Sequence, residues 1–333
     1  MMSGRRSQRK RILVLLDILM KKTDENHPLN ARELMDILKS QDILCDRKTI
    51  YDDIEALNLC GYDIINTKGP KAGYFLSGRE FELPEVALLT DAVLAADFIT
   101  HKKTDVLVKK LKGLLNEYQA ESFSGRTFID NRNKCDNEEI YYSIDTIERS
   151  IDEKKKITLN YIRHTLKDGR TPETVIKKMK VSPYALIWAD DHYYLVCNNE
   201  KYDNLMHLRL DRMKSVSLTN ENFRHFSEVS DYKESFNTAD YSAKVFNMFS
   251  GNEEELVLDC STDILEQVID RFSDKIFIRQ SGENRFKFSH KACVSEGLVA
   301  WIMQFGDKMR VEAPASLIKQ ILSRGAEIEK LYK

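Results

Sequence analysis

The chain has 333 residues, of which 42% are hydrophobic and 31% charged, and its formal net charge is −2. This length predicts roughly two to four domains, and this composition excludes a disordered or membrane-embedded chain. The near-neutral charge also excludes a protein that coats nucleic acid indiscriminately.

The N-terminal residues are locally basic and start a helix. Apolar residues recur every three or four positions over residues 8–20, which predicts an amphipathic helix. Its leading end holds five basic residues and no acid over residues 5–11. A specific DNA-binding protein needs such a patch only on its docking face, so we expect DNA contacts from Arg5, Arg6 and Arg9. Taken alone, the stretch fits a solvated helix start or a tail equally well.

Two further helices follow, each with a strong N-cap. Asn30 predicts the start of a helix over residues 31–39, with Glu33 completing a capping box. Asp46 predicts the start of a third helix over residues 47–59, closed by Gly61. Near the start of this third helix, the residues that point away from its apolar stripe are Arg47, Lys48, Thr49, Tyr51 and Asp52.

This end of the third helix predicts a DNA contact. Helix-turn-helix proteins read base edges with the N-terminal end of the second helix of the motif. We therefore expect DNA contacts from Arg47, Lys48, Thr49 and Tyr51.

A basic hairpin follows the three helices. Strands are predicted at residues 62–66 and 74–76, and the glycine-bounded turn between them carries Lys68 and Lys71, placed to contact backbone phosphates. Three helices and a basic hairpin are typical of a winged helix-turn-helix domain, which we assign to residues 1–80. Double-stranded operator DNA is the expected partner. A protein-binding adaptor is an alternative, because winged helices also bind proteins.

The third helix also carries a family resemblance. DRKTIYDDIEAL at residues 46–57, followed by GYDI at residues 61–64, resembles the recognition-helix signature of the WYL-domain transcriptional regulators. Many members of that family have a second arginine where Asp52 stands here.

Residues 81–143 are predicted to form a helical connector. Residues 83–96 are apolar on more than one side, and a second helical pattern runs from Leu107 to Tyr118. A helix that is apolar on several faces needs several neighbours. The connector therefore fits part of a homodimer interface or a plain intradomain core.

The pattern changes to β after a predicted helix at residues 144–151. Short strands at hairpin spacing favour a small, strongly bent sheet or an Sm/SH3-like β-barrel, which we assign to residues 144–228. The predicted strands are residues 157–161, 177–181, 193–197, 206–210 and 214–218.

The fourth of these strands carries a charged face. Alternation places His207, Arg209 and Asp211 on one side and apolar residues on the other. Such a face is costly to bury unless its charges are paired or a ligand completes them. An Arg–Asp pair at a strand end is the structural alternative to a ligand site.

Two segments of this region are similar to the WYL domain. Tyr193-Tyr194-Leu195 stands where the family has Trp-Tyr-Leu, and the run RLDR at residues 209–212 fits the second family signature. The resemblance implies a domain that senses an anionic small molecule or a single-stranded nucleic-acid effector, since guanidinium groups bind phosphate bidentately. Carried over by position, it implies a pocket formed by Tyr184, His207, Arg209 and Arg212.

Residues 229–333 are predicted to form the last domain. Residues 236–251 are expected to be a linker, and the following β-α-β-β-α-β-α order predicts a ferredoxin-like α/β fold. The segment WIMQFG at residues 301–306 is similar to the extension that follows the WYL domain in many of these regulators. We expect Trp301 to lie in its core.

Motifs of enzymes, metals and membranes are missing from the sequence. It has no phosphate-binding loop, no serine nucleophile elbow and no zinc-protease motif, and its six cysteines are far apart. We expect no catalytic residue, cofactor or metal. Without a signal peptide or an apolar span, a cytoplasmic protein with no membrane partner is expected.

These features predict a multidomain α+β protein, a dimeric and ligand-responsive transcriptional regulator. The alternative is a nucleic-acid-processing enzyme that uses the winged helix only as a targeting module.

Overall fold

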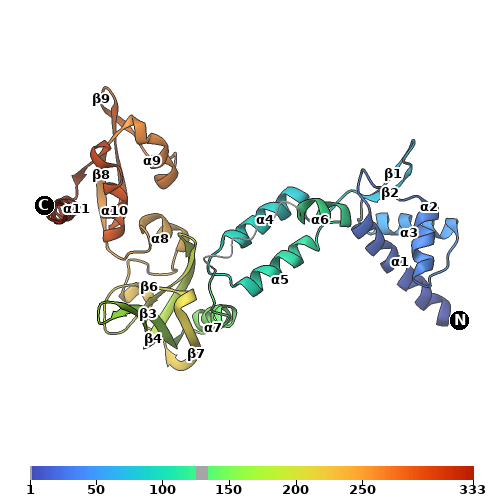
Figure 1. The fold of residues 1–333 in the computed structure, drawn as a ribbon, viewed down its shortest axis with the longest axis horizontal. Helices are drawn as coiled ribbons and strands as arrows, with labels where there is room; N and C mark the ends of the chain where they lie inside the picture. The colour runs from blue at the N-terminus through green and yellow to red at the C-terminus, as the bar shows by residue number, and fades with distance from the viewer. Residues whose placement is uncertain (1, 125–133) are drawn as a thin grey trace. The chain divides into compact units, whose positions relative to one another are not determined.

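The computed structural model describes residues 2–124 and 134–333. The chain divides into two compact units, one up to Lys134 and the other from Cys135 to Lys333 (Figure 1). The first unit is helical with one β-hairpin, and the second contains two separate β-sheets. The chain is thus a multidomain α+β protein, as predicted.

The first unit begins with three helices, α1 (Met2–Lys22), α2 (Ala31–Ser40) and α3 (Arg47–Leu59). They pack around one apolar cluster, in which the largest fully buried side chains are Leu15, Leu19, Leu34, Leu38 and Ile50. Both predicted caps are present. The Asn30 side chain accepts hydrogen bonds from two backbone N–H groups of α2, and the Glu33 carboxylate accepts one from the Asn30 N–H. The predicted start and end of α3 are confirmed.

A two-stranded hairpin completes this part of the first unit. Its strands β1 (Ile64–Thr67) and β2 (Gly73–Leu76) pair antiparallel. Leu29, just before α2, exchanges two backbone hydrogen bonds with Tyr74, with N–O distances of 3.0 and 2.8 Å. This bridge attaches the hairpin to the start of α2. The close approach requires a glycine at position 73, because a Cβ there would lie 2.7 Å from the Leu29 carbonyl carbon.

The connector contains α4 (Leu83–Ala95), α5 (His101–Lys112) and α6 (Glu117–Ser124). The helical pattern predicted to run through residue 118 is interrupted, because α5 ends at Lys112 and Gly113 follows. The connector is joined to the preceding helices by Asn116, whose side-chain amide donates to the Thr23 carbonyl at 3.1 Å and the Asp24 carboxylate at 2.8 Å. Leu88, Leu89 and Val106 lie exposed on its surface.

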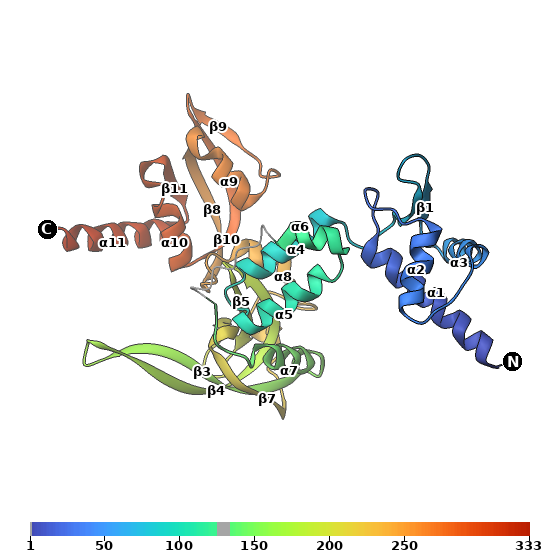
Figure 2. The same ribbon diagram turned by 45° about the vertical axis from the view of Figure 1, so that its right-hand side comes forward.

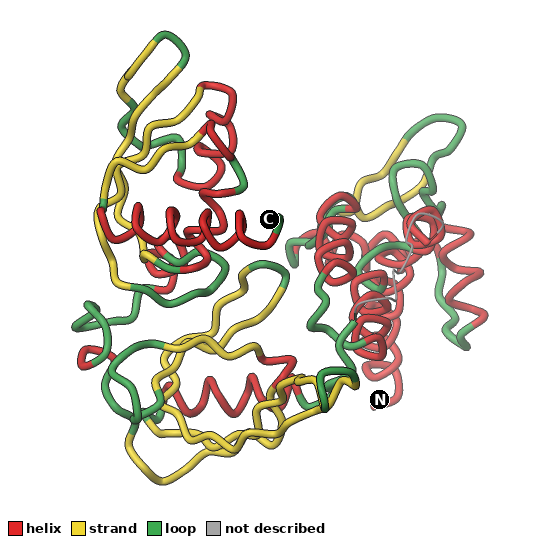
Figure 3. Tube along the Cα trace, turned by 60° about the vertical axis from the view of Figure 1, so that its left-hand side comes forward, coloured by secondary structure: helices red, strands yellow, loops and turns green. Residues whose placement is uncertain are grey.

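The first sheet of the second unit follows α7 (Ile140–Asp152). Its strand order is β6-β5-β4-β3-β7 with antiparallel pairing throughout, and α7 packs on one face through Ile147 (Figure 3). The strands are β3 (Lys155–Lys167), β4 (Thr171–Ala189), β5 (His192–Asn198), β6 (Met206–Arg209) and β7 (Met213–Asn222). Since β6 and β7 form opposite edges, the described residues make an open sheet, so of the two expected forms the sheet is seen and a closed β-barrel is not.

β3 and β4 are longer than predicted. Their register continues to the pair Lys167–Thr171, so the two strands form a hairpin that extends beyond the rest of the sheet (Figure 2). β6 is shorter than predicted, because a 3₁₀ turn at Leu210–Arg212 follows Arg209. Asp211 therefore lies in a turn and not on the strand.

The second sheet has the strand order β11-β8-β10-β9, also antiparallel. Its residues alternate, so that Leu256, Leu258 and Cys260 of β8 enter the core with Phe288 of β10 and Leu298 of α10. The elements are β8 (Asn252–Ser261), α9 (Leu265–Phe272), β9 (Arg279–Gly282), β10 (Arg285–Val294), α10 (Glu296–Met303), β11 (Met309–Ala313) and α11 (Ala315–Leu331). Trp301 packs partly buried against this core, close to Phe246.

The segment expected to be a linker is a packed part of the second unit. It contains the helix α8 (Thr238–Lys244), and a 3₁₀ turn (Phe226–Glu228) precedes it. Tyr241 packs in a cluster against the first sheet, whereas Phe246 is fully buried in the core of the second. The linker prediction is wrong because these aromatic side chains bury themselves on both sides.

Candidate functional site

The N-terminal end of α3 presents positive charge to solvent. The Asp46 carboxylate accepts hydrogen bonds from the Thr49 backbone N–H at 2.8 Å and from its hydroxyl at 2.7 Å, and these bonds lower the pKa of Asp46. Arg47 and Lys48 are exposed, and neither forms an ion pair with another described residue. Two cations without an ion-pair partner among the described residues therefore stand at a helix start whose Thr49 N–H is capped by Asp46. Thr49 has its hydroxyl committed to the cap.

Tyr51 lies between α3 and the hairpin. It is 42% exposed, and its ring centroid is 6.1 Å from that of Tyr74 on β2. Burial raises the pKa of the Tyr74 hydroxyl, and the nearby charge of Arg47 opposes this shift. The predicted contact residues Arg47 and Tyr51 therefore share one surface with the hairpin strand.

The other predicted basic contacts lie at different places on the first unit. Lys68 and Lys71 are exposed in the hairpin turn, and the Lys71 ammonium donates to the Asn26 carbonyl at 3.4 Å. Arg9 is exposed on α1. The side chains of Arg5 and Arg6 lie outside the described residues.

Arg11 belongs to the same basic run in sequence but has a different environment. Its side chain is only 14% exposed and pairs with Asp53 of α3, whose side chain is 4% exposed. This hydrogen-bonded pairing raises the pKa of Arg11. Sequence analysis missed the pair, although helical spacing contained the signal: Arg11 lies one turn before the buried Leu15.

In the second unit, Arg209 at the end of β6 forms an ion pair with Asp211 in the following turn. Its Nε donates to one carboxylate oxygen of Asp211 at 3.0 Å and its Nη2 to the other at 2.6 Å. This bidentate pair raises the pKa of Arg209. Arg212, in the same 3₁₀ turn, is partly exposed and has no ion pair or hydrogen bond with another described side chain. Residues 209–212 thus hold one guanidinium group paired with a carboxylate and one without an ion-pair partner among the described residues.

His207 cannot serve as a cationic ligand contact at neutral pH. Its Nε2 lies 2.9 Å from the Tyr241 hydroxyl, and burial lowers the pKa of His207 to about 4. The imidazole is therefore neutral at pH 7, and its expected ligand contact stays a prediction.

Tyr184 is a core residue. It is 5% exposed, packs against the rings of Phe223, Phe226 and Phe236, and donates its hydroxyl to the Arg224 carbonyl at 2.7 Å. The four expected ligand residues thus differ in exposure: Tyr184 is buried, whereas His207, Arg209 and Arg212 are partly exposed.

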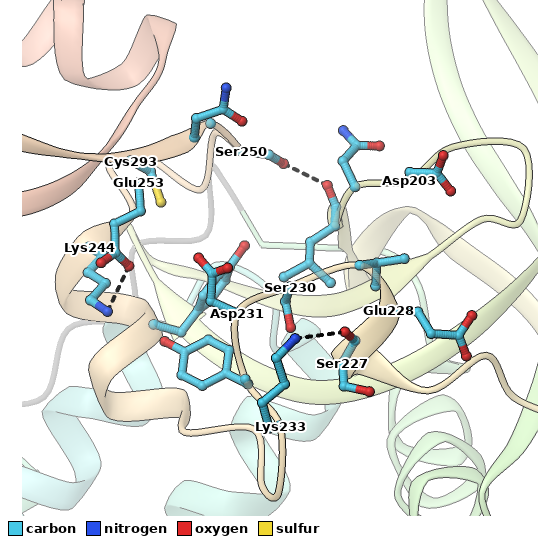
Figure 4. A pocket seen from close by; sticks show the side chains of 17 residues that line it. Asp203, Ser227, Glu228, Ser230, Asp231, Lys233, Lys244, Ser250, Glu253 and Cys293 are labelled. Atoms are coloured by element: carbon cyan, nitrogen blue, oxygen red, sulfur yellow. Dashed lines mark hydrogen bonds and ion pairs between the residues drawn. The ribbon is translucent and has the colours of Figure 1, made fainter.

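A pocket in the second unit was missed by sequence analysis (Figure 4). It has a volume of about 740 Å³ and is lined by the loop before β6, the segment around residues 227–233, the end of α8 and the start of β8. We call it the junction pocket. No sequence motif marks it, because its walls come from segments that are distant in the chain.

Among the described residues, neither a metal-binding cluster nor a helix able to span a membrane is present. Within residues 2–124 and 134–333, no group of three or more His, Cys, Asp or Glu side chains is arranged to hold a metal ion. No helix in the described part of the chain has both the length and the apolar composition needed to cross a bilayer.

Two known domain families match the second unit. The WYL domain matches residues 143–218, which contain most of the first sheet, and the WCX domain matches residues 252–328, which contain the second. The predicted WYL domain and its C-terminal extension are thereby confirmed.

Two proteins are similar to longer parts of the chain. YobV of Bacillus subtilis (strain 168), an uncharacterized HTH-type transcriptional regulator, is 23% identical over 223 residues, which are 64% of this chain and 66% of that protein. The proteasome accessory factor B/C (PafBC) of Arthrobacter aurescens is 16% identical, with a TM-score of 0.28, over 94% of this chain and 47% of that one. The chain thus spans less than two thirds of the length of either.

Proposed function

We propose that the chain, which matches the WYL domain over residues 143–218 and the WCX domain over residues 252–328, is a transcriptional regulator that binds duplex DNA and responds to a ligand. The observation that carries the proposal is the Asp46-capped end of α3, where Arg47 and Lys48 are exposed and unpaired among the described residues. The relationship to YobV supports it, because that protein is named as an HTH-type regulator.

In this proposal, α1, α2, α3 and the hairpin form a winged helix-turn-helix. The N-terminal end of α3 enters the major groove, where Arg47 and Tyr51 reach base edges, and Lys68 of the wing contacts backbone phosphate. Two observations support this placement. The apolar stripe of α3 is buried on Leu15 and Leu34, and its charged end is left open to solvent.

The WYL domain would bind the ligand, and the connector would hold two copies together. Arg212 is the free guanidinium in the 3₁₀ turn, and Arg209 could exchange Asp211 for an anionic ligand. The exposed Leu88, Leu89 and Val106 of the connector support a homodimer, because their burial against a second copy would remove apolar surface from water. We further assign an Sm-like sheet to the WYL domain and a ferredoxin-like fold to the WCX domain, which the strand order β11-β8-β10-β9 supports.

Fluorescence anisotropy of labelled duplex DNA at several salt concentrations tests the proposal. Promoter DNA from the protein's own genomic neighbourhood should bind more tightly than a scrambled duplex of the same length. The binding constant should fall as salt rises, because phosphate contacts release counterions. Equal affinity for both duplexes, or no binding, would contradict a specific DNA-binding function.

A further inference from the structure

The junction pocket has the size of a small-molecule site. Its volume of about 740 Å³ lies inside the range of roughly 300–1,000 Å³ typical of ligand pockets. Its walls include the loop before β6 in the WYL domain and the start of β8 in the WCX domain. A molecule in this pocket would contact both domains.

The floor of the pocket is largely apolar. Leu205, Val229, Tyr241 and Cys293 line it and are each no more than 9% exposed. The Cys293 thiol has no hydrogen-bond partner among the described residues, and burial raises its pKa to about 11. At neutral pH this thiol is uncharged. The floor therefore suits the apolar body of a ligand.

The rim of the pocket carries more negative than positive charge. Four carboxylates line it against two lysines: Asp203, Glu228, Asp231 and Glu253 against Lys233 and Lys244 (Figure 4).

Both lysines are already engaged. Lys244 lies 2.9 Å from the Asp240 carboxylate and 2.8 Å from that of Glu253, and Lys233 donates to the Ser227 carbonyl at 3.1 Å. An incoming anion would have to displace one of these contacts.

Asp231 is the carboxylate of the rim that has no ion-pair partner among the described residues. Asp203 and Glu228 both pair with Arg224, at 2.9 and 3.2 Å. Asp231 is exposed and forms no ion pair with another described residue. An apolar floor below a free carboxylate is the combination that binds an organic cation, because the body is buried while the charge is paired.

We propose that the junction pocket binds a small organic cation, with its apolar body on Leu205 and Val229 and its ammonium group against Asp231. This site and this ligand class differ from the anionic effector of the WYL turn. The ring of Tyr232 also lines the pocket but already has Nζ of Lys244 5.9 Å from its centroid, so Asp231 remains the partner for the ammonium group.

The pocket is connected to the WYL strand β6. The Tyr241 hydroxyl lies 2.9 Å from Nε2 of His207, which precedes Arg209 by two residues on this strand. Ser250, ahead of β8, donates to the Leu205 carbonyl at 2.8 Å. A bound molecule would therefore contact residues that are hydrogen-bonded to both domains. An effect of this molecule on DNA affinity rests on the proposed function, whereas its binding to the pocket does not.

Isothermal titration calorimetry of the full chain, without DNA, tests the site with three probes of the same shape and different charge. These are the 2-phenylethylammonium ion, 2-phenylethanol and phenylacetate. The cation should give saturable heat and bind more tightly than both analogues. No saturable heat from the cation, or equal binding of all three probes, would overturn the proposal.

Three variants locate the binding. Asp231→Asn should weaken cation binding about tenfold, the effect of losing one charge-assisted contact at a partly open rim. Asn204→Arg, which adds a cation at the exposed rim, should abolish it. Asp145→Asn removes an exposed carboxylate from α7 and should leave it unchanged.

Thermal unfolding of each variant without probe verifies that it is folded. Parent-like affinity in Asp231→Asn, or the same loss in Asp145→Asn, would refute the site. Because the titration contains no DNA, a failure of the DNA-binding proposal would leave its result intact.

Discussion

Arg11 of α1 and Asp53 of α3 form a bidentate ion pair, with Nε–Oδ2 at 2.6 Å and Nη2–Oδ1 at 3.0 Å. Both side chains are largely buried between the helices. The pair joins α3 to α1 six residues after Arg47, so it fixes the orientation of the helix whose exposed end is proposed to meet DNA.

Breaking this pair should destabilise the first unit. Arg11→Met leaves the Asp53 carboxylate buried without its partner, which should cost about 3 kcal/mol of unfolding free energy. Urea denaturation measures the loss. The double variant Arg11→Met/Asp53→Leu should recover most of it, because no unpaired charge remains. Lys21→Met, which removes an exposed pair with Asp17, is the control and should cost less than about 0.5 kcal/mol.

Two glycine substitutions should have opposite effects. At Gly73 a methyl group would meet the Leu29 backbone, so Gly73→Ala should cost about 1–3 kcal/mol by overpacking. At Gly325, inside α11, nothing lies within 4 Å of an added Cβ, so Gly325→Ala should stabilise the chain by about 0.5–1 kcal/mol through helix propensity. Thermal and urea unfolding would measure both. Equal stability of the two variants would contradict the close approach at Gly73.

His207 should make the stability of the second unit depend on acid. Its pKa is 6.5 in an unfolded chain and about 4 in the fold, so between these values the unfolded state binds the proton preferentially. Stability should be complete above pH 6.5 and fall by about 3 kcal/mol as the pH drops towards 4. His207→Gln should reduce this slope in urea denaturation at a series of pH values. The control His164→Gln, on an exposed part of β3, should keep the parent slope.

Substitutions of Arg209 and of Tyr184 should have different effects on the ligand response. With a short single-stranded oligonucleotide as probe, Arg209→Ala should abolish the change in operator affinity and leave binding of bare operator intact. Tyr184→Phe should keep the response and lose about 1 kcal/mol of stability, because the hydroxyl and its hydrogen bond to the Arg224 carbonyl are removed while the buried ring stays. If Arg209→Ala instead unfolds the protein, its pair with Asp211 is purely structural.

Local signals were sufficient for much of the fold. α3 was predicted to within its terminal residues because the Asp46 cap, the apolar spacing and Gly61 all agree. The strand and helix order after residue 252 was predicted for the same reason. The prediction failed where the chain departs from a repeating pattern: polar residues after position 161 concealed the continuation of β3, and a 3₁₀ turn replaced the end of β6.

The sites depend more on contacts between distant segments. Arg9 and Arg11 are neighbours in one basic run, yet only Arg11 lies opposite a buried carboxylate, which composition does not indicate. Tyr184 was selected by position in a family motif, but its surroundings come from Phe223, Phe226 and Phe236, about forty or more residues later. The junction pocket could not be predicted, because segments that are far apart in the sequence form it.

The most direct test of the account is the affinity of Arg47→Ala/Lys48→Ala for operator DNA, measured by fluorescence anisotropy. Its control is Lys102→Ala/Lys109→Ala, which removes two exposed lysines from α5. We predict that the first variant stays folded and binds at least about tenfold more weakly, as expected for losing contacts at the base edges, and that the control binds like the parent. Parent-like affinity in Arg47→Ala/Lys48→Ala would contradict the assignment of α3 as the DNA-reading helix.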